Sequence, residues 1–366
     1  MTTPTPKGPC GRRAPVADRL RVALVGGPMY DALYAPFLDD VEVVVHADHP
    51  TLNRKVAALL AAGERIDVLS THGKYAPSQS PWLRPLDDLV DTSALAPKAV
   101  ELCSYRGDVL CAPRNIDVRI LWWRTDRMPA PPAKWHDLHA SDVVFGFTGK
   151  ESGLFGLFFE LVTGLHGHLF DADLRPTMNT HAAKHAVETI VKFAARAPAD
   201  LPDWHYDQVD AALLAGRVDC AAAWPGGYDA IAASSLYDRL RPALYPGGYS
   251  YSGCHGWAIP TTCGDVERAA DFVQELCSVT THAREPGIPA HVHALAARVP
   301  RDAVDAERLA VTQETIATAM ITYPHIEGFD AIEDAGWQAI NAAIRGEIDA
   351  GAATLRMQAA AEVALA

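Results

Sequence analysis

Residues 105–126 read Tyr105-Arg-Gly-Asp-Val-Leu-Cys-Ala-Pro113-Arg-Asn115-Ile-Asp117-Val-Arg119-Ile-Leu-Trp122-Trp123-Arg-Thr-Asp126, and the fold can be inferred from this stretch. Its first apolar run, residues 109–112, stops at Pro113, because proline cannot donate a hydrogen bond to a sheet ladder. A second apolar run, residues 118–123, begins almost at once, with no helix between the two. The pattern predicts a backbone that leaves one sheet and enters another. We expect this junction at the floor of a cleft between two lobes, where small ligands commonly bind.

The pattern that joins the two runs resembles a known hinge. Gly107-x-x-x-x-x-Pro113-x-Asn-x-Asp-x-Arg-x-Leu-Trp-Trp123 is similar to the first hinge of the type II periplasmic binding proteins. More narrowly, it resembles the hinge of the family 1 extracellular solute-binding proteins, the maltodextrin-binding-protein-like family. This chain departs from the family in having Trp123-Arg124 where Tyr-Asn is usual.

Further motifs recur along the chain in the order that this family has them. They are Leu-Arg-Pro-Leu-Asp-Asp at 83–88, Pro-Pro-Ala-Lys-Trp at 131–135, Trp-Pro-Gly at 224–226 and Trp-Ala-Ile-Pro at 257–260. Each motif is unspecific alone, whereas their shared order is not. The last one resembles the second hinge strand, which returns the chain to the first lobe.

The first seventy residues predict a β-α-β-α-β unit. Apolar, β-branched runs at 20–26, 41–45 and 66–70 indicate strands, and helical spacing between them indicates helices, the second starting at a Thr51 cap. Such units have parallel strands, and their ligands bind beyond the carboxyl ends of the strands.

We therefore predict an α/β protein with a two-lobed type II periplasmic-binding-protein fold. Each lobe is expected to be a mixed sheet flanked by helices, with hinge strands between the lobes. The expected division is a disordered N-terminal tail (1–18), a first lobe (19–114 plus 259–320) and a second lobe (115–258 plus 321–366).

Composition restricts the class of partner. The chain has 366 residues, 49% of them hydrophobic and 21% charged, which is typical of a globular protein. Its formal charge is 32 − 45 = −13. Nucleic acids and anionic membrane surfaces attract cationic proteins, so we expect neither as a partner.

Two features bear on the compartment. Residues 1–18 lack the apolar segment of a signal peptide, and the seven cysteines are odd in number and scattered. We expect a reduced, cytoplasmic protein as the sequence stands. A truncated or misassigned N-terminus would instead leave the family's usual periplasmic or extracellular location open.

The sequence carries none of the familiar catalytic motifs. The sequence has no Gly-x-Ser-x-Gly, no phosphate loop and no His-Glu-x-x-His. No cysteine or further histidine is spaced to complete a familiar metal site with His166 and His168, whereas His291 and His293 follow a Pro-Ala loop and could reach the cleft. We predict no catalytic residue, no metal and no cofactor.

The expected site lies where strand ends and hinge segments converge. We predict that Trp224 offers a flat apolar face and that Asp117 accepts hydrogen bonds from hydroxyls or an amine. Weaker candidates stand on neighbouring segments: Tyr30, His72, Asn115, Arg119, Glu151, Tyr228 and Trp257. If Lys74, His72, Arg114 and Arg119 face the cleft, an anionic ligand would also be accommodated.

The resemblance implies non-catalytic binding of a small polar solute, a carbohydrate or related metabolite, by hinge closure. It implies a monomer that serves as the substrate-binding component of an ABC-type importer, with the permease as a further partner. The alternative is a cytoplasmic ligand sensor or an enzyme built on the same fold and acting in a catabolic pathway, because fold alone does not fix function.

Overall fold

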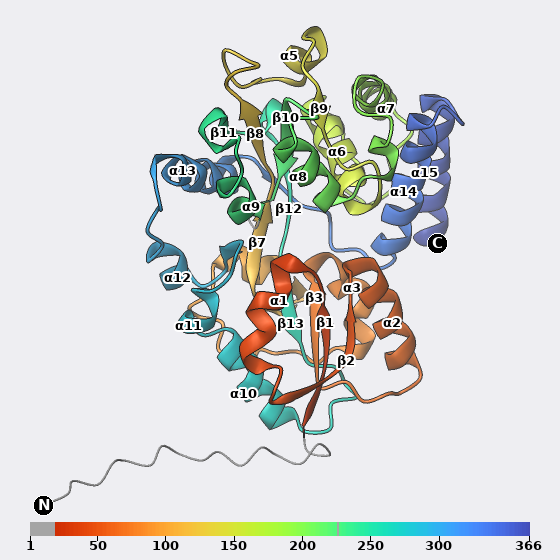
Figure 1. Cartoon of the computed structure of the whole chain (residues 1–366). Helices are drawn as coiled ribbons and strands as arrows, with labels where there is room; N and C mark the ends of the chain where they lie inside the picture. The colour runs from red at the N-terminus through yellow and green to blue at the C-terminus, as the bar shows by residue number, and fades with distance from the viewer. Residues whose placement is uncertain (1–18, 225–226) are drawn as a thin grey trace, which may run out of the picture.

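The computed structural model describes residues 19–224 and 227–366. The expected disordered tail, residues 1–18, lies outside the described residues. The described chain forms two α/β lobes, one above the other in Figure 1, joined by strands that run between them. This arrangement confirms the predicted fold class.

The first lobe is built on a five-stranded sheet. Its order is β2 (Val41–Ala47), β1 (Leu20–Val25), β3 (Val68–His72), β13 (His255–Ala258) and β6 (Ala112–Pro113). As the sequence predicts, β1 runs parallel to β2 and to β3. Strand β13, which returns the chain from the second lobe, pairs antiparallel with both β3 and β6. A small hairpin, β4 (Ser104–Tyr105) and β5 (Asp108–Val109), precedes β6.

The second lobe has a four-stranded sheet with the order β11 (Leu240–Ala243), β8 (Ile120–Arg124), β10 (Cys220–Ala223) and β9 (Phe145–Gly146). Strand β8 lies antiparallel to both of its neighbours, whereas β10 and β9 are parallel, so the sheet is mixed. The predicted apolar run 118–123 is divided between two strands of different sheets, because β7 (Asn115–Val118) ends before Arg119 and β8 begins after it.

A third sheet lies between the lobes and forms the hinge. Its order is β14 (Ile288–Pro289), β7 (Asn115–Val118), β12 (Ser250–Gly253) and β15 (Met320–Ile321). The chain passes from β6 through β7 to β8, and it returns through β12 to β13. The two predicted hinge segments therefore pair directly, with Asp117 opposite Gly253.

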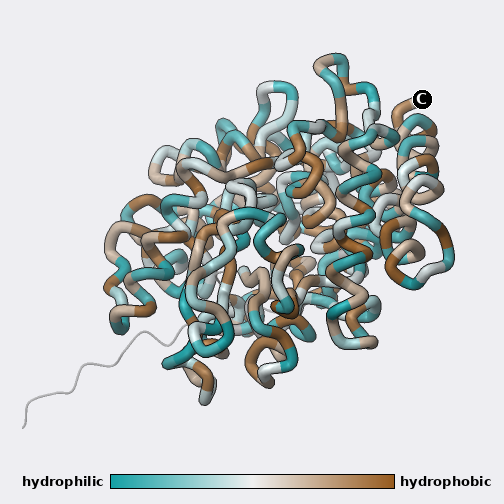
Figure 2. Tube along the Cα trace, turned by 90° about the horizontal axis from the view of Figure 1, so that it is seen from above, coloured by the Kyte–Doolittle hydropathy of each residue, from teal (hydrophilic) through white to brown (hydrophobic). Residues whose placement is uncertain are grey.

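Helices cover the outer faces of the sheets. Those that follow the strands of the first lobe are α1 (Pro28–Tyr34), α2 (His49–Ala61), α3 (Ala76–Gln79), α4 (Pro97–Leu102), α10 (Val266–Leu276), α11 (Val279–His282) and α12 (Val292–Ala296). Those of the second lobe in Figure 1 are α5 (Trp135–Ala140), α6 (Glu151–Gly164), α7 (His181–Ala194), α8 (Tyr206–Leu214), α9 (Tyr228–Ala232), α13 (Ala303–Thr318), α14 (Phe329–Ile344) and α15 (Ala350–Ala364). Along the outer helices, hydrophilic and hydrophobic residues alternate, as expected for amphipathic helices with one buried face (Figure 2).

Two apolar cores support the two lobes. The first gathers buried residues between Leu20 and Val118 and between Cys254 and Ala290, and the second those between Ile120 and Tyr251 and between Tyr323 and Ala361. The lobe boundaries drawn from the sequence stay a prediction. One helix assigned there to the first lobe, α13, contacts β11 and β8 of the second sheet.

Six cysteines lie within the described residues, and all six are free and buried. The sequence suggested that they are dispersed, but the fold brings the sulfurs of Cys103 and Cys254 to 3.5 Å from each other. The compartment of the protein stays a prediction. Among the described residues, no helix has the length and apolar character needed to cross a membrane.

Candidate functional site

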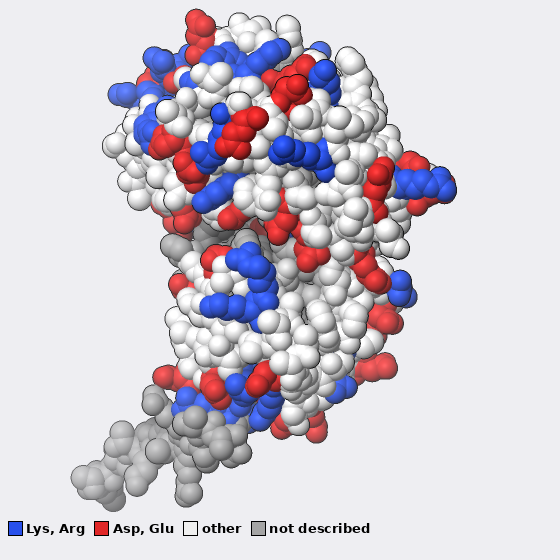
Figure 3. All heavy atoms as spheres, turned by 90° about the vertical axis from the view of Figure 1, so that its right-hand side faces the viewer, with Lys and Arg blue, Asp and Glu red and all other residues white. Residues whose placement is uncertain are grey.

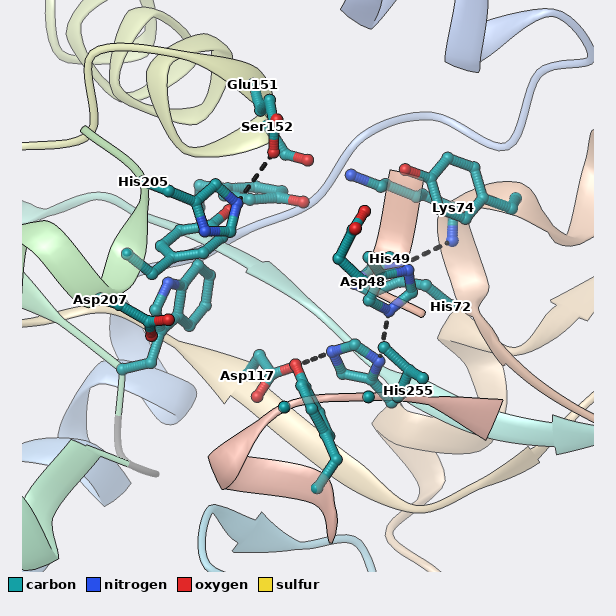
Figure 4. A pocket seen from close by; sticks show the side chains of 18 residues that line it. Asp48, His49, His72, Lys74, Asp117, Glu151, Ser152, His205, Asp207 and His255 are labelled. Carbon is teal, nitrogen blue, oxygen red and sulfur yellow. Dashed lines mark hydrogen bonds and ion pairs between the residues drawn. The ribbon is translucent and has the colours of Figure 1, made fainter. Parts of the chain in front are cut away.

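A cavity of about 200 Å³ opens at the junction of the lobes, at the carboxyl ends of β1 and β3 (Figure 4). Both lobes contribute to its wall. The first lobe and the hinge supply Val25, Gly26, Gly27, Tyr30, Asp48, His49, His72, Lys74, Tyr75, Asp117 and His255. The second lobe and its end of β12 supply Glu151, Ser152, His205, Tyr206, Asp207, Trp224 and Tyr251.

A chain of hydrogen bonds runs along the first wall. His255 Nε2 lies 3.0 Å from Asp117 Oδ2, and His255 Nδ1 lies 2.8 Å from His49 Nε2. Because the carboxylate only accepts, His255 donates to it through Nε2, and a second hydrogen bond joins His255 Nδ1 to His49. Asn115 donates to the other Asp117 oxygen at 2.9 Å and accepts from the His255 backbone N–H. Asp117 is thereby held in one orientation at the cavity edge.

His72 ends β3 beside this chain. Its Nδ1 accepts a hydrogen bond from the backbone N–H of Lys74 at 3.1 Å. The proton of a neutral His72 is then on Nε2, which makes that atom a donor. The ring packs against the backbone of Gly253 so closely that a Cβ there would lie 2.3 Å from Nε2. Glycine at this position in β12 leaves room for the imidazole.

The opposite wall combines a carboxylate with aromatic rings. Glu151 opens α6 and accepts from His205 Nε2 at 2.8 Å. Its φ of 58° lies in the left-handed region, which is costly for a residue with a side chain. Tyr206 meets the ring of Trp224 edge-on, with centroids 5.9 Å apart. A flat apolar face therefore lies next to an acceptor, as in many sites for ring-shaped polar ligands.

The environment sets the protonation of these groups. Burial, together with the neighbouring His255, holds the pKa of His49 and of His72 well below 6.5, so both rings are neutral at pH 7. The hydrogen bond from His205 lowers the pKa of Glu151, which is therefore ionised. Burial raises the pKa of Tyr206 to about 12, so its hydroxyl keeps its proton and can donate.

His72, Asp117 and His255 place three potential metal ligands within 4.8 Å of one another, which the sequence did not predict. A metal ion needs an unprotonated nitrogen from each histidine. The hydrogen bonds described above occupy both nitrogens of His255 and leave His72 Nε2 protonated. The arrangement therefore suits hydrogen bonding to a solute better than metal coordination.

Five of the nine residues predicted from the sequence line the cavity: Trp224, Asp117, His72, Tyr30 and Glu151. Three of these, Tyr30, His72 and Asp117, come from the first lobe and hinge, whereas Glu151 and Trp224 come from the second lobe. Figure 4 shows Glu151 across the cavity from His72 and Asp117. Whether they bind a ligand stays a prediction.

The other four predicted residues do not line the cavity. Asn115 is buried and orients Asp117 from behind. The guanidinium of Arg119 is buried against Glu160, below Trp224. Tyr228 stacks on Trp122 in the second core, and Trp257 packs edge-on against Tyr34 in the first.

The expectation of an anionic ligand depended on cations that the structure shows to be paired. Lys74 reaches the cavity but is bound to Glu333, and Arg114 forms a bidentate pair with Glu285. Arg119 is paired with Glu160 as described above. None of the three is free to bind an anion.

Several lining residues were not predicted, above all His49, His205, Tyr206 and His255. For two of them, His205 and Tyr206, the sequence does contain a signal that could have identified them. His205-Tyr206 begins a helix directly after a loop, with Gln208 completing a capping box, and helix starts next to sheet ends often face ligands. The pairing of His49 with His255 spans 206 residues and has no local signal.

The geometry can be compared with known proteins. A family model described as bacterial extracellular solute-binding protein matches residues 37–283, more than half of the chain. The chain belongs to this family. The solute-binding family is non-catalytic, in keeping with a cleft that holds a solute between two lobes. This confirms the resemblance seen in the hinge motifs.

Solved structures of solute-binding proteins share the fold. MalE3 of T. maritima, with maltose bound, is 17% identical with a TM-score of 0.81, covering 94% of this chain and 99% of its own. A protein of Agrobacterium radiobacter in complex with ribitol is 18% identical with a TM-score of 0.81, covering 94% and 98%. A protein of Thermotoga lettingae bound to α-D-tagatose is 17% identical with a TM-score of 0.80, covering 95% and 100%. At these identities the likeness concerns the fold.

Proposed function

We propose that this protein binds a single-ring carbohydrate, or a related polyhydroxylated solute, between its lobes and delivers it to an ABC-type permease. One observation carries the proposal. The cavity at the hinge is lined from both lobes by an aromatic face, at Trp224, and by donors and acceptors, at His72, Asp117 and Glu151. A solute that touches both walls stabilises the closed form by its extra contacts there.

The size of the cavity favours a small solute. Pockets for drug-sized ligands enclose about 300–1,000 Å³. The value of about 200 Å³ in this conformation suits one ring better than an oligosaccharide chain. The related structures contain maltose, ribitol and α-D-tagatose, and two of these three ligands are of that smaller size.

The same family membership favours binding without catalysis over a sensor or enzyme with this fold. We propose that the protein acts as a monomer, because the hinge and both cavity walls come from one chain. A permease would then contact the closed form of the two lobes.

A thermal-shift screen of hexoses, pentoses, cyclitols and linear maltodextrins tests the proposal. A solute that binds only the folded protein raises its melting temperature. We expect stabilisation by single-ring or open-chain polyols and little by long maltodextrins. Calorimetry should then give one site per chain, and Trp224→Ala should abolish the shift. Failure of every polyhydroxylated solute to stabilise the protein would contradict the proposal.

A further inference from the structure

The cavity wall carries more carboxylates than lysines and arginines, and histidines pair with two of the carboxylates, His255 with Asp117 and His205 with Glu151. Four carboxylates line the cavity, those of Asp48, Asp117, Glu151 and Asp207, whereas Lys74 is the one lysine or arginine among the described lining residues. Asp48 and Glu151 stand on opposite walls (Figure 4). Acidic side chains are also visible along the constriction between the lobes (Figure 3).

The charge of Lys74 is not available to a ligand. Its ammonium lies 2.8 Å and 2.9 Å from the two oxygens of Glu333, and both side chains are almost fully buried. Burial opposes the charged form of Lys74, but the Glu333 carboxylate outweighs it and raises the pKa of the lysine. The next cation, Lys150, precedes Glu151 but does not line the cavity.

Two of these carboxylates have oxygens that accept no hydrogen bond from the described part of the protein. Glu151 accepts from His205 through Oε2, and no contact within the described part of the chain engages its Oε1. Asp207 has no hydrogen bond or ion pair to any described residue. The neutral imidazoles of His49 and His72 do not offset these charges.

Unpaired donors on the same walls point to an oxygen-rich solute. Tyr251 is 3% exposed and His72 is 7% exposed, and both line the cavity. Neither the Tyr251 hydroxyl nor His72 Nε2 has a hydrogen-bond partner among the residues described. Both atoms are open to the cavity rather than fully enclosed by protein, so they can donate to acceptors on a bound solute.

Building on the function proposed above, we propose that the solute is cationic: a polyhydroxylated single-ring molecule that carries a protonated amine. Its hydroxyls accept from His72 and Tyr251, and its ammonium binds between the carboxylates of Glu151 and Asp207. Charge-assisted hydrogen bonds of this kind are stronger than neutral ones. The rings of Tyr206 and Trp224, which line the same cavity, also favour a cation, because aromatic rings are negative at their centres.

Matched pairs of sugars test the charge. Calorimetry at pH 7 should compare glucose, galactose and mannose with glucosamine, galactosamine and mannosamine, and with the neutral N-acetyl derivatives. We expect one amine to bind at least about tenfold more tightly than its hydroxyl and N-acetyl counterparts. The preference should decrease as salt is added, because screening weakens partly exposed charge pairs.

Charge-neutral variants locate the contact. Glu151→Gln and Asp207→Asn should each weaken binding of the amine more than binding of the neutral hexose, so that the amine preference decreases by about tenfold. Glu64→Gln is the matched control, because Glu64 is exposed and lies before β3, at the opposite end of the strands from the cavity. It should leave both affinities unchanged.

The outcomes separate the two proposals. Equal or tighter binding of the neutral sugars would overturn the cationic solute and leave the solute-binding proposal standing. A rise in melting temperature with Zn²⁺, and with none of the amines, would overturn it in favour of a metal at His72, Asp117 and His255. Binding of neither sugars nor amino sugars would overturn both proposals.

Discussion

The ammonium of Lys74 lies 2.8 Å from Glu333 Oε1, and the two side chains belong to different lobes. Lys74 follows β3 of the first sheet, whereas Glu333 is on α14, whose apolar residues belong to the second core. The pair is 7% and 4% exposed. A buried, bidentate ion pair therefore crosses the junction next to the cavity.

We expect Lys74→Met to destabilise the protein by about 3–5 kcal/mol, because it leaves the Glu333 carboxylate buried without a partner. The double variant Lys74→Met/Glu333→Leu should recover most of that loss. Denaturant unfolding measures both. Lys98→Met is the control, because the Lys98–Glu101 pair is exposed, and its effect should stay below about 1 kcal/mol. A double variant as unstable as the single one would contradict this account.

Trp224→Ala should weaken binding of the identified solute roughly tenfold or more, because it removes the aromatic face of the cavity. Calorimetry gives the affinity. Tyr228→Phe serves as the comparison, since Tyr228 lies four residues further on but is buried in the second core. Its affinity should match that of the parent protein. Equal affinities in all three proteins would place the binding site elsewhere.

Gly253→Ala should weaken binding by displacing His72, because the added Cβ would meet the imidazole at 2.3 Å. The clash predicts non-additivity. In a His72→Ala background, the same substitution should cost much less stability than in the parent protein. Gly351→Ala, within α15 and away from the cavity, should be neutral or slightly stabilising. Additive effects of Gly253→Ala and His72→Ala would rule out the proposed contact.

The backbone strain at Glu151 can be tested by comparing the stabilities of its glycine and alanine variants. At its φ of 58°, Glu151→Gly should be more stable than Glu151→Ala by about 1 kcal/mol, because only glycine adopts this conformation freely. Exposed Lys184, inside α7, should show the reverse order, with alanine the more stable. Thermal unfolding of the four variants decides this. The same order at both positions would argue against strain at Glu151.

Buried neutral histidines predict a loss of stability in acid. Burial, with His291 close by, lowers the pKa of His282 to about 3. Between about pH 6.5 and 3 the unfolded chain binds a proton that the folded chain does not, so stability falls as pH falls, by up to about 1.4 kcal/mol per unit. His282→Asn, which keeps an acceptor for the His291 N–H, should flatten this slope. Exposed His168→Asn should leave it unchanged. Urea unfolding at pH 7 and pH 5 measures the difference.

Much of the fold followed from local pattern. The strands predicted at 20–26, 41–45 and 66–70 correspond to β1, β2 and β3, and Pro113 ends its strand as expected. The predicted cap of α2 was wrong by one turn, since Asp48 accepts from the Thr51 N–H. A one-turn shift is common where two polar residues compete for the same role.

The site was harder to predict from the sequence, because residue type does not tell whether a residue lies at the end of a strand, next to the cavity, or in its buried interior. His255 and Trp257 share one face of β13, yet His255 lines the cavity and Trp257 is in the core. Two residues along a strand is about 7 Å, enough to separate a strand end from its interior. Similarly, Arg119 continues the spacing of Asn115 and Asp117, but its side chain is drawn inward by Glu160.

The hinge sheet has a mechanical consequence. The chain passes between the lobes at β7 and at β12, and these two crossings are hydrogen-bonded side by side, through Asp117 with Gly253 and through Val118 with Ser252. Sliding one crossing past the other would break that register, whereas bending both together preserves it. The two connections therefore behave as one flexure rather than as two independent tethers.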